Sequence, residues 1–216
     1  TKDVLTGLTG TSSSGKDVGV YNTALAGTDT NYNLTFNQGS LEITKADATV
    51  KGNSSTKTYD GTTQSVNGFT VNGLVGDDTA DMLTGVSGTS ASGKDAGEYS
   101  TNLSGTDTNY NLTFEDGKLT ITKASLTATL NDNSKIYDGT SYSGGNGITF
   151  NGFVNGETAS LLGGNLVYSG TSQGAKDAGN YIISGSGLTS NNYNISFVNG
   201  KLTINKKDLT ISNITA

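Results

Sequence analysis

The stretch Gly117–Leu130 (GKLTITKASLTATL) contains two runs of alternating apolar and polar residues, separated only by Lys123. Alternation of this kind is typical of a β-strand with one buried face. Leu119 and Ile121 lie at odd positions before the lysine, whereas the apolar residues from Leu126 onward lie at even positions. Because side chains alternate between the two faces of a strand, the sequence predicts that the buried face changes sides at Lys123.

The same arrangement occurs at Gly39–Val50 (GSLEITKADATV) and at Gly200–Ile211 (GKLTINKKDLTI). We interpret each stretch as a nearly continuous β-segment whose first half closes one module and whose second half opens the next. No proline and no Gly/Ser tether interrupts these segments, so the connections are expected to be stiff. The sequence therefore predicts modules joined end to end in a rod.

Three further motifs recur along the chain with nearly constant spacing, which is typical of a tandem repeat. The aspartates of the first motif (GKDVGVY, GKDAGEY and AKDAGNY) are separated by 95 − 17 = 78 and 177 − 95 = 82 residues. The hexapeptides NYNLTF, NYNLTF and NYNISF begin at residues 31, 109 and 192. The third motif is KTYDGT at Lys57–Thr62 and KIYDGT at Lys135–Thr140.

These spacings divide the chain into four parts. Residues 46–123 and 124–206 are complete repeat modules, residues 1–45 are the second half of a repeat, and residues 207–216 are the first strand of a further repeat. The partial repeat 1–45 has no Tyr-Asp-Gly motif. Because unpaired strand edges invite pairing with another chain, strand exchange between molecules is expected at this truncated module.

The predicted fold class is mainly β, with tandem sandwich-like modules of about 80 residues. Within 124–206 we expect six or seven short strands, including a hairpin from Tyr193–Phe197 to Lys201–Ile204. The segment Glu157–Leu162 (ETASLL) is expected to form one short helix, because it starts with an acidic residue and a glycine follows it, as at capped helix ends.

Two sheet architectures compete for this pattern. The spacing of Asp95, Gly97 and Tyr99 resembles the tyrosine corner of immunoglobulin-like sandwiches. The short helix instead suggests β-grasp-like α+β modules. We predict the sandwich-like module and keep the β-grasp-like module as the alternative.

The composition argues against several kinds of functional site, namely metal sites built from thiolate or imidazole ligands and nucleic-acid-binding surfaces. The 216 residues carry a formal net charge of −6, contain no Cys, His, Trp or Pro, and draw all 13 positive charges from lysine. Thiolate and imidazole metal ligands are therefore absent, and a basic, arginine-rich footprint for nucleic acid is not present. No apolar run reaches 18 residues, so no membrane span is expected in this part of the chain.

The repeated acidic residues are expected to stabilise turns. Asp17, Asp95 and Asp177 are interpreted as loop residues that bond local backbone, because no second carboxylate recurs beside them for acid–base catalysis. The oxygen-rich clusters 77–81 and 131–133 lack the calcium-loop pattern and are interpreted as caps and solvated turns. The sequence thus predicts no catalytic, cofactor-binding or metal-binding residue, and no cofactor.

The repeated lysines Lys16, Lys94 and Lys176 each lie next to an aspartate, so they are candidates for a covalent crosslink. A lysine–asparagine isopeptide bond needs a buried lysine with a neighbouring asparagine and an acidic catalyst, and it is expected to be absent here.

The motifs together resemble one family. The patterns K-x-Y-D-G-T, G-[DE]-x-T-A-x-x-L, D-A-G-x-Y and N-Y-x-[LI]-x-F-x-x-G-x-L-x-I-x-K are similar to the YDG/MBG-type tandem repeats of large bacterial surface or secreted adhesins, filamentous-haemagglutinin-like and related. The resemblance implies an extracellular or cell-surface location and a non-catalytic stalk or spacer role. Host or biofilm ligands would then be bound by other regions of the parent protein. The alternative is that the repeats themselves bind glycan, extracellular matrix or biofilm polysaccharide.

Overall fold

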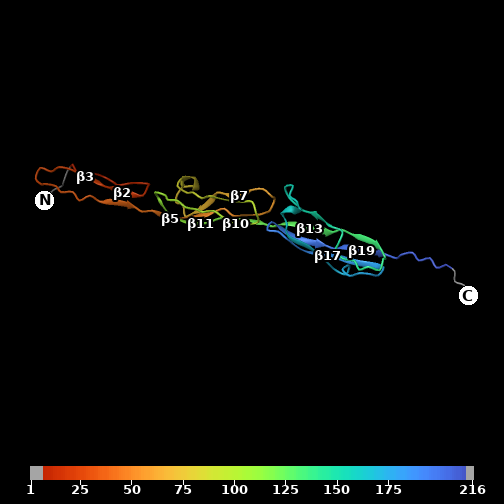
Figure 1. Ribbon diagram of the computed structural model, residues 1–216. Helices are drawn as coiled ribbons and strands as arrows, with labels where there is room; N and C mark the ends of the chain where they lie inside the picture. Colours follow the sequence, from red (N-terminus) through yellow and green to blue (C-terminus); the bar gives the residue numbers. More distant parts are fainter. Residues whose placement is uncertain (1–6, 213–216) are drawn as a thin grey trace. The chain divides into compact units, whose positions relative to one another are not determined.

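A computed structural model describes residues 7–212 of the chain (Figure 1). The described residues form 19 β-strands and two single turns of 3₁₀-helix, and they contain no α-helix. The mainly β prediction is confirmed, and the β-grasp-like alternative, which needs a helix packed on the sheet, is not. The predicted partial repeats 1–45 and 207–216 extend into residues 1–6 and 213–216, which lie outside the described residues.

The chain folds into two compact units. Unit 1 comprises residues 1–54, 66–91 and 100–118, and unit 2 comprises residues 55–65, 92–99 and 119–216. The repeat 124–206 lies wholly within unit 2, whereas the repeat 46–123 contributes strands to both units. The repeat bounds therefore remain a prediction of the sequence, distinct from the compact units.

The first twelve strands are three to seven residues long. They are β1 (Thr9–Thr11), β2 (Gly19–Asn22), β3 (Ala24–Ala26), β4 (Ser40–Ile43), β5 (Ala46–Gly52), β6 (Ser55–Thr58), β7 (Gln64–Asn67), β8 (Phe69–Asn72), β9 (Ser90–Gly93), β10 (Gly97–Ser100), β11 (Tyr110–Glu115) and β12 (Lys118–Thr122). The 3₁₀ turn η1 (Ala80–Met82) lies between β8 and β9. Strands β1 and β3, β2 and β4, and β7 and β9 form two-stranded sheets.

The remaining strands belong to unit 2. They are β13 (Ala124–Leu130), β14 (Asn133–Ile136), β15 (Ile148–Asn151), β16 (Gly163–Ser169), β17 (Gly179–Thr189), β18 (Tyr193–Val198) and β19 (Gly200–Asn205). The 3₁₀ turn η2 (Ala159–Leu161) lies between β15 and β16.

Unit 1 is centred on the sheet β11-β5-β8. The opening strand β5 lies in the middle, parallel to β11 and antiparallel to β8. One face of the sheet is buried, because the alternating residues Ala48 and Val50 are 3% and 0% exposed. They pack with Leu83, Leu103 and Tyr110 in one apolar core.

Unit 2 contains the sandwich-like repeat. Its first sheet, β15-β13-β18, has the same order and pairing directions as β8-β5-β11. Its second sheet is β14-β19-β17-β16, in which the closing strand β19 pairs in parallel with β14 and antiparallel with β17. Leu130 of the first sheet and Ile183 and Leu202 of the second are at most 1% exposed and belong to one core, so the two sheets face each other across it.

The strand that links successive repeats changes face as predicted. In β12, Leu119 and Ile121 are 0% and 2% exposed, and in β13, Leu126 and Leu130 are 0% and 1% exposed. Lys123, the single residue between these strands, is exposed. Strand β12 is the middle strand of the sheet β10-β12-β6, whereas β13 is the middle strand of β15-β13-β18. One nearly continuous β-segment therefore serves as the central strand of two different sheets.

The predicted hairpin between Tyr193–Phe197 and Lys201–Ile204 is wrong. Strand β18 pairs with β13, while β19 pairs with β14 and β17, so consecutive strands enter different sheets. Gly200 belongs to no tight turn and instead lets the chain pass close to β13. A Cβ atom there would lie 2.6 Å from the Leu130 carbonyl oxygen.

The predicted helix at Glu157–Leu162 is reduced to the three-residue η2, and its counterpart in the preceding repeat is η1. Neither turn has a side-chain cap at its first residue. The acidic residue before η2, Glu157, bonds tertiary partners described below, so the capping interpretation was also wrong.

Candidate functional site: the joints between repeats

The tyrosine of each D-x-G-x-Y motif forms the predicted corner. The hydroxyl groups of Tyr21, Tyr99 and Tyr181 donate hydrogen bonds of 2.8, 2.9 and 2.9 Å to the carbonyl oxygens of Asp17, Asp95 and Asp177. This is the tyrosine-corner geometry, in which a tyrosine bonds backbone a few residues upstream. The corner fixes the loop that carries each aspartate.

In two of the three motifs the aspartate side chain bonds the following repeat. The side-chain amide of Asn192 donates to Asp95 Oδ1 at 2.9 Å, and its carbonyl oxygen accepts from the Ala96 backbone N–H, also at 2.9 Å. Asn109 makes the same pair of bonds with Asp17 and Val18, both at 2.9 Å. We call residues 16–18, 78 and 107–110 the first joint, which lies in unit 1. The second joint lies in unit 2 and consists of residues 59, 94–96, 157 and 190–193.

The two clamping asparagines are held in place by their own short turns. Asp107 Oδ1 accepts from the backbone N–H groups of Asn109 and Tyr110 at 2.8 and 3.1 Å. In the second joint Ser190 Oγ replaces the carboxylate and accepts from Asn192 and Tyr193, both at 3.1 Å. Such local side-chain bonds to backbone are typical of Asp and Ser in turns.

The backbone of each asparagine also holds the linking strand. The carbonyl oxygen of Asn192 accepts from the N–H of Ala124, the first residue of β13, at 2.9 Å, and Asn109 does the same for Ala46 at 3.0 Å. The Lys123 ammonium donates to the Ser190 carbonyl at 2.8 Å. A single asparagine thus connects the corner of one repeat with the opening strand of the next.

The second joint also contains a carboxylate shared by two tyrosines. Tyr59 OH donates to Glu157 Oε1 at 2.5 Å, and Tyr193 OH donates to Glu157 Oε2 at 2.6 Å. Both tyrosines are only 3% exposed, and their rings meet edge to face with centroids 5.5 Å apart. Phe153 packs against the other side of Tyr193 at 5.4 Å. Hydrogen bonds to a charged acceptor are about twice as strong as neutral ones.

Burial and the shared carboxylate shift the ionisation of both phenols. Burial, followed by the hydrogen bond to Glu157, raises the pKa of Tyr59 well above its usual value. The same two causes, in the same order, raise the pKa of Tyr193. Both tyrosines are therefore hydrogen-bond donors at any physiological pH, because the neutral phenol is favoured.

The first joint keeps only part of this arrangement. Tyr110 OH donates to Asp78 Oδ2 at 2.7 Å, as Tyr193 does to Glu157. Residues 7–45 contain no Tyr-Asp-Gly motif, so the described part of the chain shows no counterpart of Tyr59 at this joint. Lys16 Nζ lies 3.8 Å from Asp78 Oδ1, and a cavity of about 330 Å³ opens beside it. Its lining includes Lys16, Ile43, Val75, Gly76, Asp78 and Tyr110.

A family comparison agrees with this repeated geometry. The family model of the MBG domain (YGX type) matches residues 48–120 and 126–203. The chain belongs to the MBG domain family. The resemblance to YDG/MBG-type repeats is thereby confirmed. A comparison with curated proteins found none that matches the chain.

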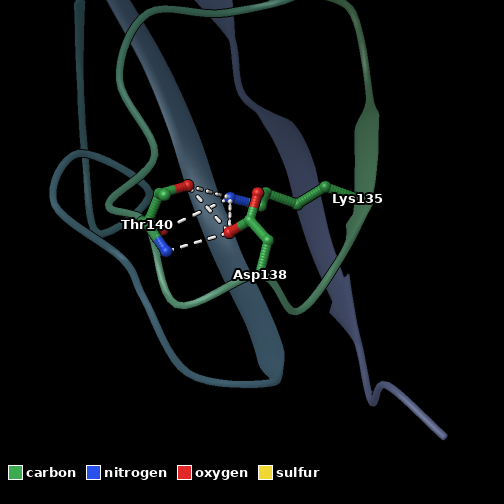
Figure 2. Close-up of polar contacts among 3 residues, drawn as sticks. All are labelled: Lys135, Asp138 and Thr140. Carbon is green, nitrogen blue, oxygen red and sulfur yellow. Dashed lines mark hydrogen bonds and ion pairs between the residues drawn. The ribbon is translucent and has the colours of Figure 1, made fainter.

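The Tyr-Asp-Gly turn of the MBG repeat is built from local bonds (Figure 2). Asp138 Oδ1 accepts from the Thr140 backbone N–H at 2.9 Å and from the Thr140 hydroxyl at 2.7 Å, while Lys135 Nζ lies 2.8 Å away. Gly139 has φ = 77°, a left-handed conformation that favours glycine. The hydrogen bond from Lys135, followed by those from Thr140, lowers the pKa of Asp138.

The other acidic clusters of the MBG repeats serve structural bonds. Asp132 Oδ1 accepts from the Lys201 backbone N–H at 2.7 Å, and Asn133 Nδ2 donates to the Tyr142 hydroxyl at 2.9 Å. The three lysines considered for a crosslink are exposed, namely Lys16, Lys94 and Lys176. The buried lysine that an isopeptide bond needs is therefore not found at any of these positions.

Sequence reasoning missed the two residues that carry the joint, Asn192 and Glu157. Both carried a signal in the repeat alignment: the first asparagine of the NYN motif recurs, and an acidic residue recurs at 78 and 157. Their partners lie 97 and 98 residues away in sequence, in the preceding repeat. Pairing at that distance cannot be read from local pattern alone.

No helix in residues 7–212 is long and apolar enough to cross a membrane. Within the same residues, no group of three or more acidic, histidine or cysteine side chains is arranged to hold a metal ion. The carboxylates named above instead bond tyrosine, asparagine and backbone groups. These hydrogen bonds fix one MBG repeat against the next.

Proposed function

We propose that these MBG repeats are non-catalytic spacer modules of a bacterial cell-surface or secreted adhesin, which hold a binding region away from the cell. Domains of this family occur in adhesin-like proteins, which supports the assignment. The extracellular location belongs to the same proposal. Ligand binding is assigned to other regions of the parent protein.

The observation that carries the proposal is the single residue between β12 and β13. Both strands are central in their sheets, so bending at Lys123 would strain hydrogen bonds on both sides of each strand. The asparagine clamp and the Tyr59–Glu157–Tyr193 cluster add side-chain bonds next to that point. A connection of this kind resists bending, whereas a Gly/Ser tether behaves as a flexible coil.

Small-angle X-ray scattering tests the proposal. A stiff array should give a radius of gyration well above the roughly 17 Å expected of a compact domain of 216 residues. Inserting Gly-Ser-Gly-Ser directly after Lys123 should broaden the distance distribution. The same insertion after Lys206, beyond β19, adds equal length without separating β12 from β13 and serves as the control. A compact wild-type profile, or equal effects of the two insertions, would contradict the spacer role.

The alternative function is direct binding of glycan or matrix by the repeats. A glycan array and a matrix-protein binding assay distinguish it from the spacer role. The spacer proposal expects no binding above background from the isolated chain. Specific binding that is lost on surface substitution outside the joints would favour the alternative.

A further inference from the structure

The opening and closing segments of the MBG repeat 124–206 run side by side in the same direction. Strand β13 pairs in parallel with β18 over six residue pairs, beginning with Ala124 opposite Tyr193. Strand β14 pairs in parallel with β19 over four, beginning with Asn133 opposite Leu202. The offset is the same in both sheets, because 193 − 124 = 69 and 202 − 133 = 69. The opening segment (β13 and β14) and the closing segment (β18 and β19) therefore keep one register through both sheets, and we call them the parallel pair.

A side chain closes the gap in the parallel pair, at the point where both segments pass from the first sheet to the second. Asp132, between β13 and β14, accepts a hydrogen bond of 2.7 Å at Oδ1 from the Lys201 backbone N–H. These two residues have the offset of the ladder, because 201 − 132 = 69. The bond thus takes the place of a ladder bond, and its charged acceptor makes it stronger than a neutral one.

The repeat 46–123 contains the same pairings. Strand β5 pairs in parallel with β11 over six residue pairs in unit 1, and β6 pairs in parallel with β12 over four in unit 2. Both have one offset, because 110 − 46 = 64 and 119 − 55 = 64. At the gap, Ser54 Oγ accepts from the Lys118 backbone N–H at 3.0 Å, and 118 − 54 = 64. The parallel pair and the side-chain bond at its gap therefore belong to both repeats.

The direction of the two segments decides how tension along the chain acts on them. Tension enters the repeat 124–206 at Lys123, just before β13, and leaves it at Lys206, just after β19. Because the segments are parallel, these two points lie at opposite ends of the pair, and tension pulls the segments lengthwise past each other. The evenly spaced bonds of a parallel ladder then share the load. Two strands pulled apart from the same end would instead separate one bond at a time.

The packing of the two segments opposes the same sliding movement. Leu126 and Leu130 of the opening segment and Leu202 of the closing segment are at most 1% exposed. Sliding by one residue would turn such side chains to the opposite face of the sheet. Both loaded strands also have a neighbour on each side, β15 and β18 for β13, and β14 and β17 for β19. The ladder therefore has no small step by which it could yield.

We propose that the parallel pair makes each MBG repeat a tension-bearing element, which is strong when pulled along the chain and weak when its strands are peeled apart. The residue at the gap, Asp132 or Ser54, carries part of the load. This inference deepens the spacer function and rests on it for its biological context. Forced unfolding is governed by the rate of unfolding and not by equilibrium stability. Resistance to tension is therefore a property separate from the stability of the fold.

Optical tweezers test the proposal on the whole chain. The chain contains no cysteine, so two introduced cysteines define where the DNA handles attach. Ser125→Cys with Lys206→Cys loads opposite ends of the parallel pair, whereas Ile136→Cys with Lys206→Cys loads the same end. All three positions are exposed. At one loading rate, the first attachment should rupture at a several-fold higher force than the second. Equal forces, or a lower force for the first attachment, overturn the proposal.

Variants at the gap test the role of Asp132. Asp132→Ala removes the acceptor of the Lys201 N–H and should lower the rupture force in the first attachment. It should not change the force in the second, where the ladder opens from its other end. Asp132→Asn keeps an acceptor oxygen and should retain more of the force. Asp177→Ala, the same truncation at an exposed position before β17, is the matched control and should change neither force. An equal fall in both attachments, or no fall in the first, overturns the load-bearing role of Asp132.

The tension-bearing role and the spacer role fail separately. Equal rupture forces in a chain whose scattering profile is extended would overturn the tension-bearing role and leave the spacer role standing. A compact profile together with a large difference between the two attachments would overturn the spacer role alone. Far-ultraviolet circular dichroism of each unloaded variant, compared with wild type, separates a lost fold from a weakened ladder.

Discussion

The phenol of Tyr59 donates a 2.5 Å hydrogen bond to Glu157, a residue 98 positions later in the chain. Tyr59 belongs to the Tyr-Asp-Gly turn of one repeat, and Glu157 precedes the 3₁₀ turn of the next. The Tyr-Asp-Gly motif of one repeat thus reaches across the joint to the next. Its tyrosine completes a cluster that one repeat could not form alone.

Replacing Tyr59 with phenylalanine removes this hydrogen bond and retains the ring. We expect the free energy of unfolding of unit 2 to fall by about 1.5–3 kcal/mol, because the donor bonds a charged group. Urea denaturation followed by circular dichroism measures the change. Tyr137→Phe alters the same motif position in the next repeat, where the ring is 39% exposed, and should cost much less. Equal losses in the two variants would remove the special role of Tyr59.

Replacing Asn192 with alanine removes both bonds of the clamp. We expect a loss of about 1–3 kcal/mol in the stability of unit 2, because two bonds to Asp95 and Ala96 disappear together. Hydrogen exchange gives a sharper measure, since the Ala96 amide should lose its protection. Asn191→Ala, at the exposed neighbouring position, is the matched control. Unchanged protection of Ala96 would show that the clamp does not form in solution.

The raised pKa values of Tyr59 and Tyr193 predict a loss of stability at high pH. Their neutral forms are favoured in the folded chain, so their contribution is complete below the unfolded tyrosine pKa of about 10 and is lost as the pH rises through the higher folded values. Absorbance at 295 nm should show these two phenols ionising after the exposed tyrosines. In Tyr59→Phe the late component should shrink, and an unchanged titration curve would contradict the prediction.

The lowered pKa of Asp138 predicts a loss of stability at low pH. Its carboxylate contributes above the unfolded aspartate pKa of about 3.9, and the contribution is lost as the pH falls toward the lower folded value. Asp138→Asn should therefore reduce the melting temperature of unit 2 at pH 7 and have a smaller effect at pH 2. The control is Asp208→Asn, at an exposed position beyond β19. Equal effects of Asp138→Asn at the two pH values would disprove the linkage.

Identical sequences in the chain adopt different structures according to their partners. NYNLTF at residues 109–114 lies almost entirely in β11, which pairs with β5, whereas the same hexapeptide at residues 31–36 forms no strand. Leu209 and Ile211 likewise correspond to Leu126 and Ala128 but are 84% and 71% exposed. Alternating sequence supplies a face that can be buried, but only a neighbouring strand turns it into a sheet.

The sequence by itself determined the mainly β class, the repeated motifs, the tyrosine corners and the change of buried face at Lys123. Each depends on residues within a few positions of one another, so alternation and turn chemistry suffice to predict it. Only the tertiary structure decided that β18 and β19 enter different sheets in parallel pairings, and that Asn192 and Glu157 bind partners in the preceding repeat. Those choices depend on which distant segments meet, and local pattern carries no information about such contacts.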